Sequence, residues 1–155
     1  MSVLTGHDVG WYIERQRLVI RPITADQMQQ NGIDLRLAET VVQIGMPGPA
    51  VCFTHGQSHL GHTEEYLELP DDLMAFVQLR STWARRGLLL PPTVVDAGFK
   101  GDLTLEIFCG GPDLAIPVGE RFIHLVFLRL TGPAEPYNGK YQFQQGVTLA
   151  KPDPA

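Results

Sequence analysis

The sequence predicts an all-β protein with a short N-terminal helix, and three observations lead to that prediction. Short apolar runs recur at intervals of about 8–12 residues and are separated by Gly and Pro. Most runs alternate apolar and polar residues, the period of a strand with one buried face. Helical spacing is clear only near the N-terminus. The pattern favours a distorted β-barrel or jelly roll over alternating strands and helices.

The elements are expected in the following order. Segment 5–18 should be helical, because Thr5 is a suitable N-cap and Val9, Tyr12, Ile13 and Leu18 form a rough helical stripe. Strands are expected at 32–45, around 51–53, and on both sides of a turn in 64–81. A short helix or turn should follow at 81–90. From residue 91 strand follows strand, and the Pro- and Gly-rich segment after Leu130 should be a loop.

Size and charge limit what the protein can be. With 155 residues the chain should form one domain, residues 1–155, in which residues 131–155 are a C-terminal tail. A net charge of −5 argues against nonspecific binding to nucleic acid or to a membrane surface. Cys52 and Cys109 lack a metal spacing and are expected to be free thiols. No signal peptide or membrane-spanning run is seen, so a cytoplasmic protein is expected.

The stretch RSTWARRG, residues 80–87, is a candidate phosphate site. It places guanidinium groups and two hydroxyls within one or two turns after a strand, and Arg side chains bind phosphate oxygens with two parallel hydrogen bonds. A solvated basic helix face would have the same sequence. From spacing alone that plainer interpretation is favoured.

The stretch VVDAGFKGDLTLEIF, residues 94–108, carries a pair of carboxylates ten positions apart. Leu103, Leu105 and Ile107 predict one apolar strand face, which leaves Glu106 on the other face. Asp96 stands at the opposite end of the same turn-and-strand element. Two carboxylates in one pocket could divide acid and base roles. A turn aspartate and a surface glutamate are the plainer alternative.

Two further stretches were considered. PYNGKYQFQQG, residues 136–146, could close over a base and a phosphate, or be an ordinary polar tail. His55, His59 and His62 would suit a metal site on a helix, but the glycines around them disfavour a helix. The chain also lacks the His-x-Glu and Pro-Cys-x-x-Cys signature of zinc-dependent cytidine-type deaminases. Zinc is therefore not expected.

Taken together and in this order, these stretches resemble the dCTP deaminase branch of the dUTPase-like superfamily. The resemblance rests on NGIDLRL, on the block from TEEYLELP to GDLTLE, on VGERFIHLVF and on the tail motif. The form PPTVVDAGF is most similar to archaeal-type members, some of which carry dCTP through to dUMP. The chain is shorter than typical members between IDLRL and TEEYLELP.

The resemblance implies a homotrimer with sites at subunit interfaces, a dCTP or dUTP substrate, and Mg²⁺ bound through the nucleotide phosphates. It implies deamination of dCTP, which would supply dUMP for thymidylate synthesis. The implied catalytic residues are Glu106 and Asp96, of which Asp96 also binds the sugar. The other implied substrate-binding residues are Arg80, Ser81, Thr82, Arg85, Thr104, Leu105, Tyr137, Lys140 and Gln144.

Two alternatives remain open on the sequence. A dUTP diphosphatase without deaminase activity would share the Arg-Ser and Asp-turn motifs, but such enzymes generally lack a glutamate at the position of Glu106 and have a Gly/Ser-rich tail. A binding or assembly module that reuses the fold would need no intact acid, arginines or tail. Because all three are present, deamination is the favoured hypothesis.

Overall fold

The structure is a computed structural model that describes residues 2–39 and 50–153. It is built mainly from antiparallel strands, as the sequence predicts. Its helical elements are α1 (Gly6–Glu14), the 3₁₀ turn η1 (Ala25–Gln27) and α2 (Ser81–Ala84). Its strands are β1 (Ser2–Val3), β2 (Val19–Arg21), β3 (Met28–Gln29), β4 (Gly32–Arg36), β5 (Ala50–Phe53), β6 (Ser58–Glu68), β7 (Leu73–Leu79), β8 (Leu88–Leu89), β9 (Thr93–Val95), β10 (Lys100–Cys109), β11 (Leu114–Pro117) and β12 (Arg121–Arg129).

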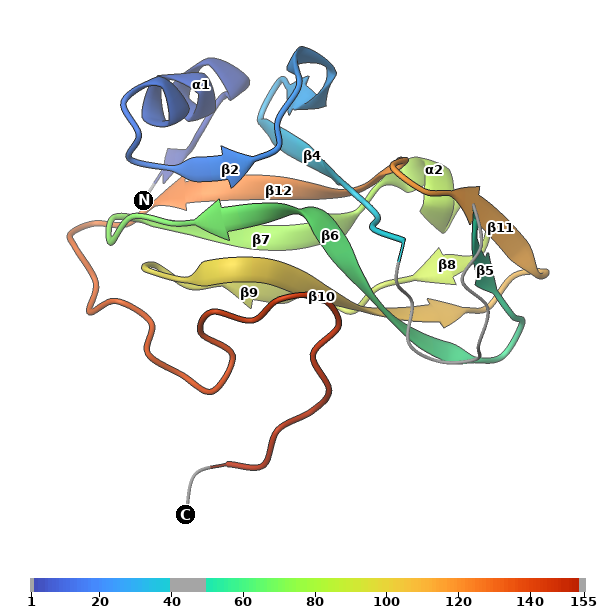
Figure 1. Cartoon of the computed structure of the whole chain (residues 1–155). Coiled ribbons are helices and arrows are strands. Elements are labelled where there is room, and N and C mark those ends of the chain that lie inside the picture. Colours follow the sequence, from blue (N-terminus) through green and yellow to red (C-terminus); the bar gives the residue numbers. More distant parts are fainter. Residues whose placement is uncertain (1, 40–49, 154–155) are drawn as a thin grey trace.

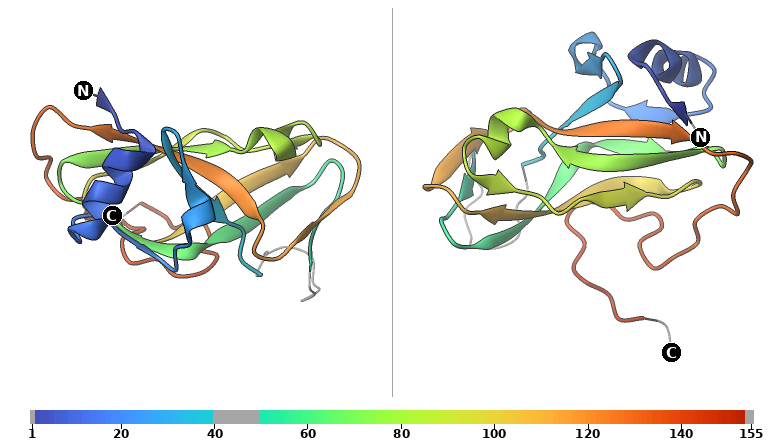
Figure 2. Two further views of the ribbon diagram at one scale, coloured as in Figure 1. Left: turned by 90° about the horizontal axis from the view of Figure 1, so that it is seen from above. Right: turned by 180° about the vertical axis from the view of Figure 1, so that it is seen from behind.

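The strands form two larger sheets and one small one. The first has the order β3-β4-β12-β7-β9, with β1 also on β12, and the second has the order β2-β6-β10-β8. β11 and β5 form a separate pair. Figures 1 and 2 show the two larger sheets stacked as layers, and side chains from both enter one apolar core. Within the described ranges these ladders stay open at their edges, so the predicted barrel is not closed.

Strand β10 carries the alternation that the sequence predicts. Leu103, Leu105 and Ile107 face the core, whereas Glu106 and Phe108 are exposed. The strand pairs along most of its length with β6, and the register shifts between Asp102 and Thr104. Glu106 lies opposite Leu60. The outer face of β6 and β10 therefore carries both polar and apolar side chains, and other segments of the chain can pack against it.

The N-terminal helix begins where predicted and ends sooner. Thr5 caps it, since its hydroxyl accepts the Asp8 N–H at 3.2 Å while the Asp8 carboxylate accepts the Thr5 N–H at 2.9 Å. Val9 and Tyr12 are buried and attach the helix to the first sheet. Leu18 is buried as well, but it lies beyond the helix, which ends at Glu14.

The remaining differences concern the ends of elements and four short elements that were not predicted from the sequence, β1, β2, η1 and β3. The strand predicted at 32–45 ends at Arg36, and the part of that prediction from residue 40 onward lies outside the described residues. β6 begins at Ser58, inside the histidine-rich stretch. Residues 131–153 follow the sheets as a loop without helix or strand, the red trace of Figure 1. Neither of the two α-helices in the described ranges has the length and apolar character to cross a membrane.

Candidate active site

A hollow of about 380 Å³ lies between the outer face of β6 and β10, strand β9 and the tail. It brings together five of the residues predicted from the sequence to form a site. The polar members of its wall include Asp96, Thr104, Glu106, Tyr137 and Gln144. The pocket thus combines two carboxylates from one turn-and-strand element with side chains from a segment about forty residues further along.

The positions of the two carboxylates follow from local structure. Asp96 directly follows β9 and opens a turn in which the Phe99 N–H donates to the Asp96 carbonyl at 3.1 Å. Gly98 has a φ of +78° in this turn, a conformation that favours glycine. Glu106 is outward because it is out of phase with the buried Leu105. Both carboxylates are exposed in the single chain and line the pocket.

The tail fits against glycines of the same turn-and-strand element. A Cβ atom on Gly98 would lie 2.5 Å from Cβ of Pro136, and one on Gly101 would lie 2.6 Å from the carbonyl oxygen of Gln144. Either distance is too short for a real contact. These two glycines therefore make room for the tail. Sequence reasoning had given the glycines only a role in the turn.

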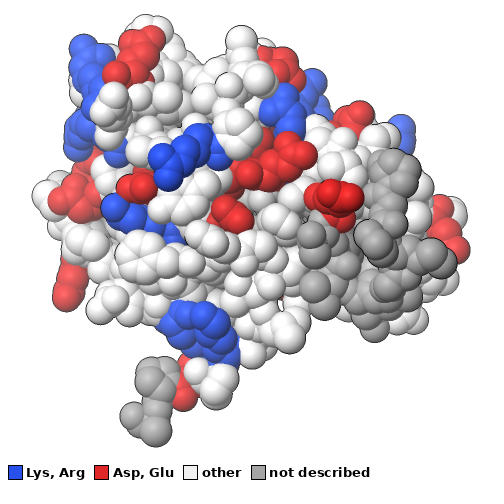
Figure 3. Space-filling view, viewed as in Figure 1, with Lys and Arg blue, Asp and Glu red and all other residues white. Residues whose placement is uncertain are grey.

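Two other predicted residues lie near the pocket without lining it by their side chains. The Leu105 side chain is in the core, so only its backbone is close to the pocket. Lys140 turns away, because its ammonium group donates to Asp153 at 2.7 Å and to the Lys151 carbonyl at 2.8 Å. Figure 3 shows basic side chains of the tail set apart beside the C-terminus.

The predicted phosphate site lies elsewhere in the chain. Ser81, Thr82 and Arg85 are exposed on or just after α2, and none of them lines the pocket described above. Arg85 instead borders a separate open hollow of about 450 Å³. Figure 1 shows α2 at the opposite end of the sheets from the tail. Buried Trp83 fastens the short helix by donating from Nε1 to the Arg121 carbonyl at 2.8 Å.

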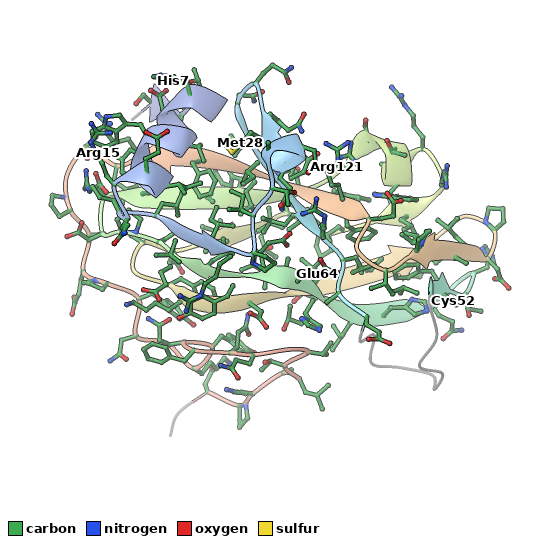
Figure 4. The ribbon with its side chains drawn as sticks, turned by 45° about the horizontal axis from the view of Figure 1, so that its top comes forward. His7, Arg15, Met28, Cys52, Glu64 and Arg121 are labelled. Atoms are coloured by element: carbon green, nitrogen blue, oxygen red, sulfur yellow. The ribbon has the colours of Figure 1, made fainter. Side chains whose placement is uncertain are left out.

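Arg80 is tied to a group of buried charges that sequence reasoning missed. Its Nε atom lies 3.0 Å from Oδ2 of Asp34, whose residue is only 2% exposed. The other carboxylate oxygen of Asp34, Oδ1, contacts Nδ1 of His124 at 2.9 Å. Nη1 of Arg121 lies 3.6 Å from Oδ2. In Figure 4 Arg121 lies between β4 and α2. No local signal marks Asp34 as buried, because its alternation with Ile33 and Leu35 predicts an outward side chain, whereas both faces of this part of β4 are buried.

Glu65 is the second buried acid of this region. It faces the core because it is in phase with Leu67 on β6, a period-two signal visible in the sequence. Its carboxylate accepts hydrogen bonds from Nε2 of Gln27 at 2.7 Å and from the Arg36 N–H at 2.9 Å. Burial nevertheless raises the pKa of Glu65 to about 7, because those donors offset only part of the desolvation.

The three histidines considered as metal ligands point in different directions. His59 and His62 are three residues apart on β6, so His59 faces the core and His62 the outer face. His55 precedes the strand and contacts the Gly111 carbonyl at 2.8 Å. Within residues 2–39 and 50–153 no group of three potential ligand side chains is placed to hold a metal ion.

The arrangement of the pocket suits proton transfer to a small polar ligand. Two exposed carboxylates stand on one wall, and the tail forms the opposite wall with aromatic and amide groups. Acidic and basic side chains are mixed across the face seen in Figure 3 rather than gathered into one basic surface. Fold and pocket together define a two-sheet β protein with a small hollow, walled in part by polar groups, beneath its own tail.

Residues 44–130, more than half of the chain, match the sequence family described as dCTP deaminase-like. The chain belongs to that family. The probable deoxyuridine 5′-triphosphate nucleotidohydrolase of Sulfolobus islandicus rod-shaped virus 1 is 45% identical over 157 residues, which cover 97% of this chain and 99% of the viral protein. The dCTP deaminase of Acidianus ambivalens is 41% identical over 168 residues, covering 96% of this chain and 97% of that protein.

A solved structure has the same fold. The crystal structure of 2′-deoxycytidine 5′-triphosphate deaminase from Agrobacterium tumefaciens superposes with a TM-score of 0.68 at 21% sequence identity. The match covers 81% of this chain and 47% of that one, so the chain spans about half its length. At this level of identity the likeness concerns the fold.

Proposed function

We propose that the protein deaminates dCTP to dUTP and ammonia. The observation that carries the proposal is the position of Glu106, an exposed carboxylate on β10 that lines the pocket together with Asp96 and the tail. The full-length similarity to the dCTP deaminase of Acidianus ambivalens supports the same reaction.

In the proposed mechanism Glu106 acts as the acid/base group. It takes a proton from water, and the resulting hydroxide adds to C4 of the cytosine. Glu106 then gives that proton to the amino group, and the proton of the added hydroxyl passes to N3. The C4–N bond breaks, and ammonia leaves as a carbonyl forms at C4. The reaction consumes one water and converts dCTP to dUTP. Protein dipoles around Thr104 and Leu105 would hold the developing charge at the base.

The other pocket residues would position the nucleoside. Asp96 would bind the 3′-hydroxyl of the deoxyribose. Tyr137 and Gln144 already line the pocket from the tail, and Lys140 would join them by leaving Asp153. Residues 131–155 would thus close the site and exclude all water except the molecule that reacts. In this scheme residues 1–155 act as a single domain.

The triphosphate would be bound by α2 of a neighbouring subunit in a homotrimer. Ser81, Thr82 and Arg85 are exposed and do not line this chain's pocket, so a second copy is needed to bring them to it. Arg80 would orient the phosphates while held by Asp34 and the Arg121 carbonyl. Mg²⁺ would enter with the substrate, bound to the phosphate oxygens.

Hydrolysis of dUTP to dUMP and pyrophosphate is the second candidate function. It is favoured by the 45% identity with the viral protein named as a probable dUTP nucleotidohydrolase. Asp96 would orient a water toward the α-phosphorus, and the bond from that phosphorus to the pyrophosphate oxygen would break. One bound nucleotide would then have Glu106 beside its base and Asp96 near its phosphates.

One incubation tests both candidates. The protein is mixed with dCTP and Mg²⁺, and ammonia, pyrophosphate and nucleotide products are measured together; a parallel reaction contains dUTP. Ammonia with dUTP or dUMP supports deamination. Pyrophosphate from both substrates, in step with ammonia in the dCTP reaction, supports the combined activity. Hydrolysis of dUTP with no ammonia from dCTP would leave a dUTP diphosphatase.

A further inference from the structure

We infer that Asp102 is a positioning residue that holds the outer part of the tail over the pocket. The inference rests on the proposed function and adds a division of the tail into two parts. Residues 137–144 form an anchor, and residues 146–148 form a latch that can open separately. Asp102 lies on the outer side of β10, largely buried beneath the tail.

The anchor is held by backbone groups. The Tyr137 N–H donates to the Ala97 carbonyl and the Phe143 N–H to the Lys100 carbonyl, each at 2.8 Å. The Asp102 N–H in turn donates to the Gln144 carbonyl at 3.1 Å. These bonds join main chain to main chain. The anchor's own Gln142 side chain adds two more, accepting the Lys100 N–H at 2.7 Å and donating to the Gly98 carbonyl at 2.9 Å. On β10 and the turn before it, these bonds use backbone groups and no side chain.

The latch is held differently, by side-chain oxygens of β10. The Gly146 N–H donates to Oδ2 of Asp102 at 2.9 Å, and the Thr148 N–H donates to Oγ1 of Thr104 at 3.0 Å. Gly146 has a φ of +63°, a left-handed conformation that glycine adopts readily. The tail therefore bends at the residue where its attachment changes from backbone to side chains.

Asp102 is directed at the latch rather than at a neighbouring histidine. His62 Nδ1 lies 3.8 Å from Oδ2 of Asp102 but only 2.9 Å from the Thr63 carbonyl, so its hydrogen bond is to the carbonyl. The Gly146 N–H is the closer partner of the carboxylate. A hydrogen bond to a charged acceptor is among the stronger single bonds that a loop can make.

The latch forms part of the pocket wall. Thr148 and Ala150 line the same pocket as Glu106. Release of the Gly146 and Thr148 amides would open that wall while the anchor stays in place. The nucleotide could then enter without displacement of the whole tail, and its binding would favour the latched state.

Amide hydrogen exchange of the nucleotide-free protein, followed by NMR, tests this division directly. In Asp102→Ala the Gly146 amide should exchange about tenfold faster or more, and the Thr148 amide should follow it. The Tyr137 and Phe143 amides should keep their wild-type rates. Asp102→Asn keeps an acceptor oxygen and should restore most of the protection of Gly146.

Glu68→Ala is the matched control, because it removes an outward carboxylate of the paired strand β6 that contacts Lys100 rather than the latch. It should leave the exchange rate of Gly146 unchanged. Unchanged exchange of Gly146 in Asp102→Ala would overturn the inference. So would equal loss of protection at all four amides, since the tail would then open as one unit.

Kinetics give a second readout. Saturating dCTP should still close the latch of Asp102→Ala, so KM should rise about tenfold while kcat stays within about threefold. A fall in kcat with unchanged KM would contradict a positioning role. Hydrogen exchange is measured without substrate, so its result does not depend on the proposed function. A protein that fails to deaminate dCTP can still show the latch, and an active enzyme can still lack it.

Discussion

The two regions that carry the predicted site residues are built in opposite ways. Around Arg80 the acids are buried and paired: Asp34 contacts two basic side chains within 3.0 Å, and Glu65 is fully buried. In the pocket Asp96 and Glu106 are exposed and face open space. Acids that are buried and paired hold the surrounding side chains in place, whereas exposed acids in a hollow remain free to exchange protons. The difference is consistent with the proposal that the pocket performs the chemistry and that the region around α2 presents phosphate-binding groups to another chain.

The largest effect is expected from Glu106→Gln. The amide keeps the size of the side chain and removes proton transfer, so the rate of ammonia release from dCTP should fall about a thousandfold or more. Nucleotide affinity should stay within about tenfold of wild type. Glu64→Gln is the matched control, because this outer-face glutamate of β6 does not line the pocket (Figure 4). Near wild-type deamination by Glu106→Gln would remove Glu106 from the mechanism.

Arg85→Ala should weaken nucleotide binding by about 2–4 kcal/mol, the scale for loss of a charge-assisted phosphate contact in a closed site. Arg85 is the better choice for this test because Arg80→Ala would also remove one of the basic partners of buried Asp34. Affinity is measured by calorimetry with dUTP and Mg²⁺. Deoxycytidine, which has no phosphates, should be a poor substrate. Efficient turnover of deoxycytidine would show that α2 is not a phosphate site.

Deletion of the chain after Gly139 should lower kcat/KM for dCTP on the order of a hundredfold, because the remaining pocket cannot position the base or exclude water. Circular dichroism and gel filtration should show an unchanged fold and size, since none of the deleted residues that the structure describes is buried. Full activity would mean that the tail is not a lid, and loss of the fold would mean that it is structural.

The last effect is on stability rather than on activity, and it concerns the region of paired acids. Burial raises the pKa of Glu65 from an ordinary 4.5 to about 7, so the folded protein keeps a proton that the unfolded chain releases. The stabilising contribution of that proton is present below about pH 4.5 and is lost as pH rises through about 7, a decline of about 3 kcal/mol. Glu65→Gln should flatten this part of a urea-denaturation series. An unchanged pH slope would mean that Glu65 has the same pKa in the folded and unfolded protein.

The sequence predicted the pocket better than the region around α2, for a physical reason. Alternation along β10 and the turn after Asp96 are local patterns, and they place Glu106 and Asp96 correctly relative to the core. The pairing of Arg80 with Asp34 joins residues 46 positions apart, so local spacing does not reveal it. The requirement for glycine at position 101 likewise depends on a tail segment that arrives from about forty residues away.

The helix and the predicted barrel show the same limit. Thr5, as a suitable N-cap residue, identified the start of α1, but no equally local signal marked its end at Glu14. Alternation predicted strands from residue 32 onward, but not the short strands β1, β2 and β3 before it. Whether the outer strands pair and close a barrel depends on contacts between distant edges, which alternation does not encode.

The central claim is that the pocket of one chain works with α2 of another, and mixed oligomers test it most directly. Glu106→Gln and Arg85→Ala chains, each poorly active alone, are unfolded together in equal amounts and refolded. If every site takes Glu106 from one chain and Arg85 from its neighbour, random reassortment should restore about a quarter of wild-type dCTP deamination. A mixture no more active than the two variants measured separately would contradict the account.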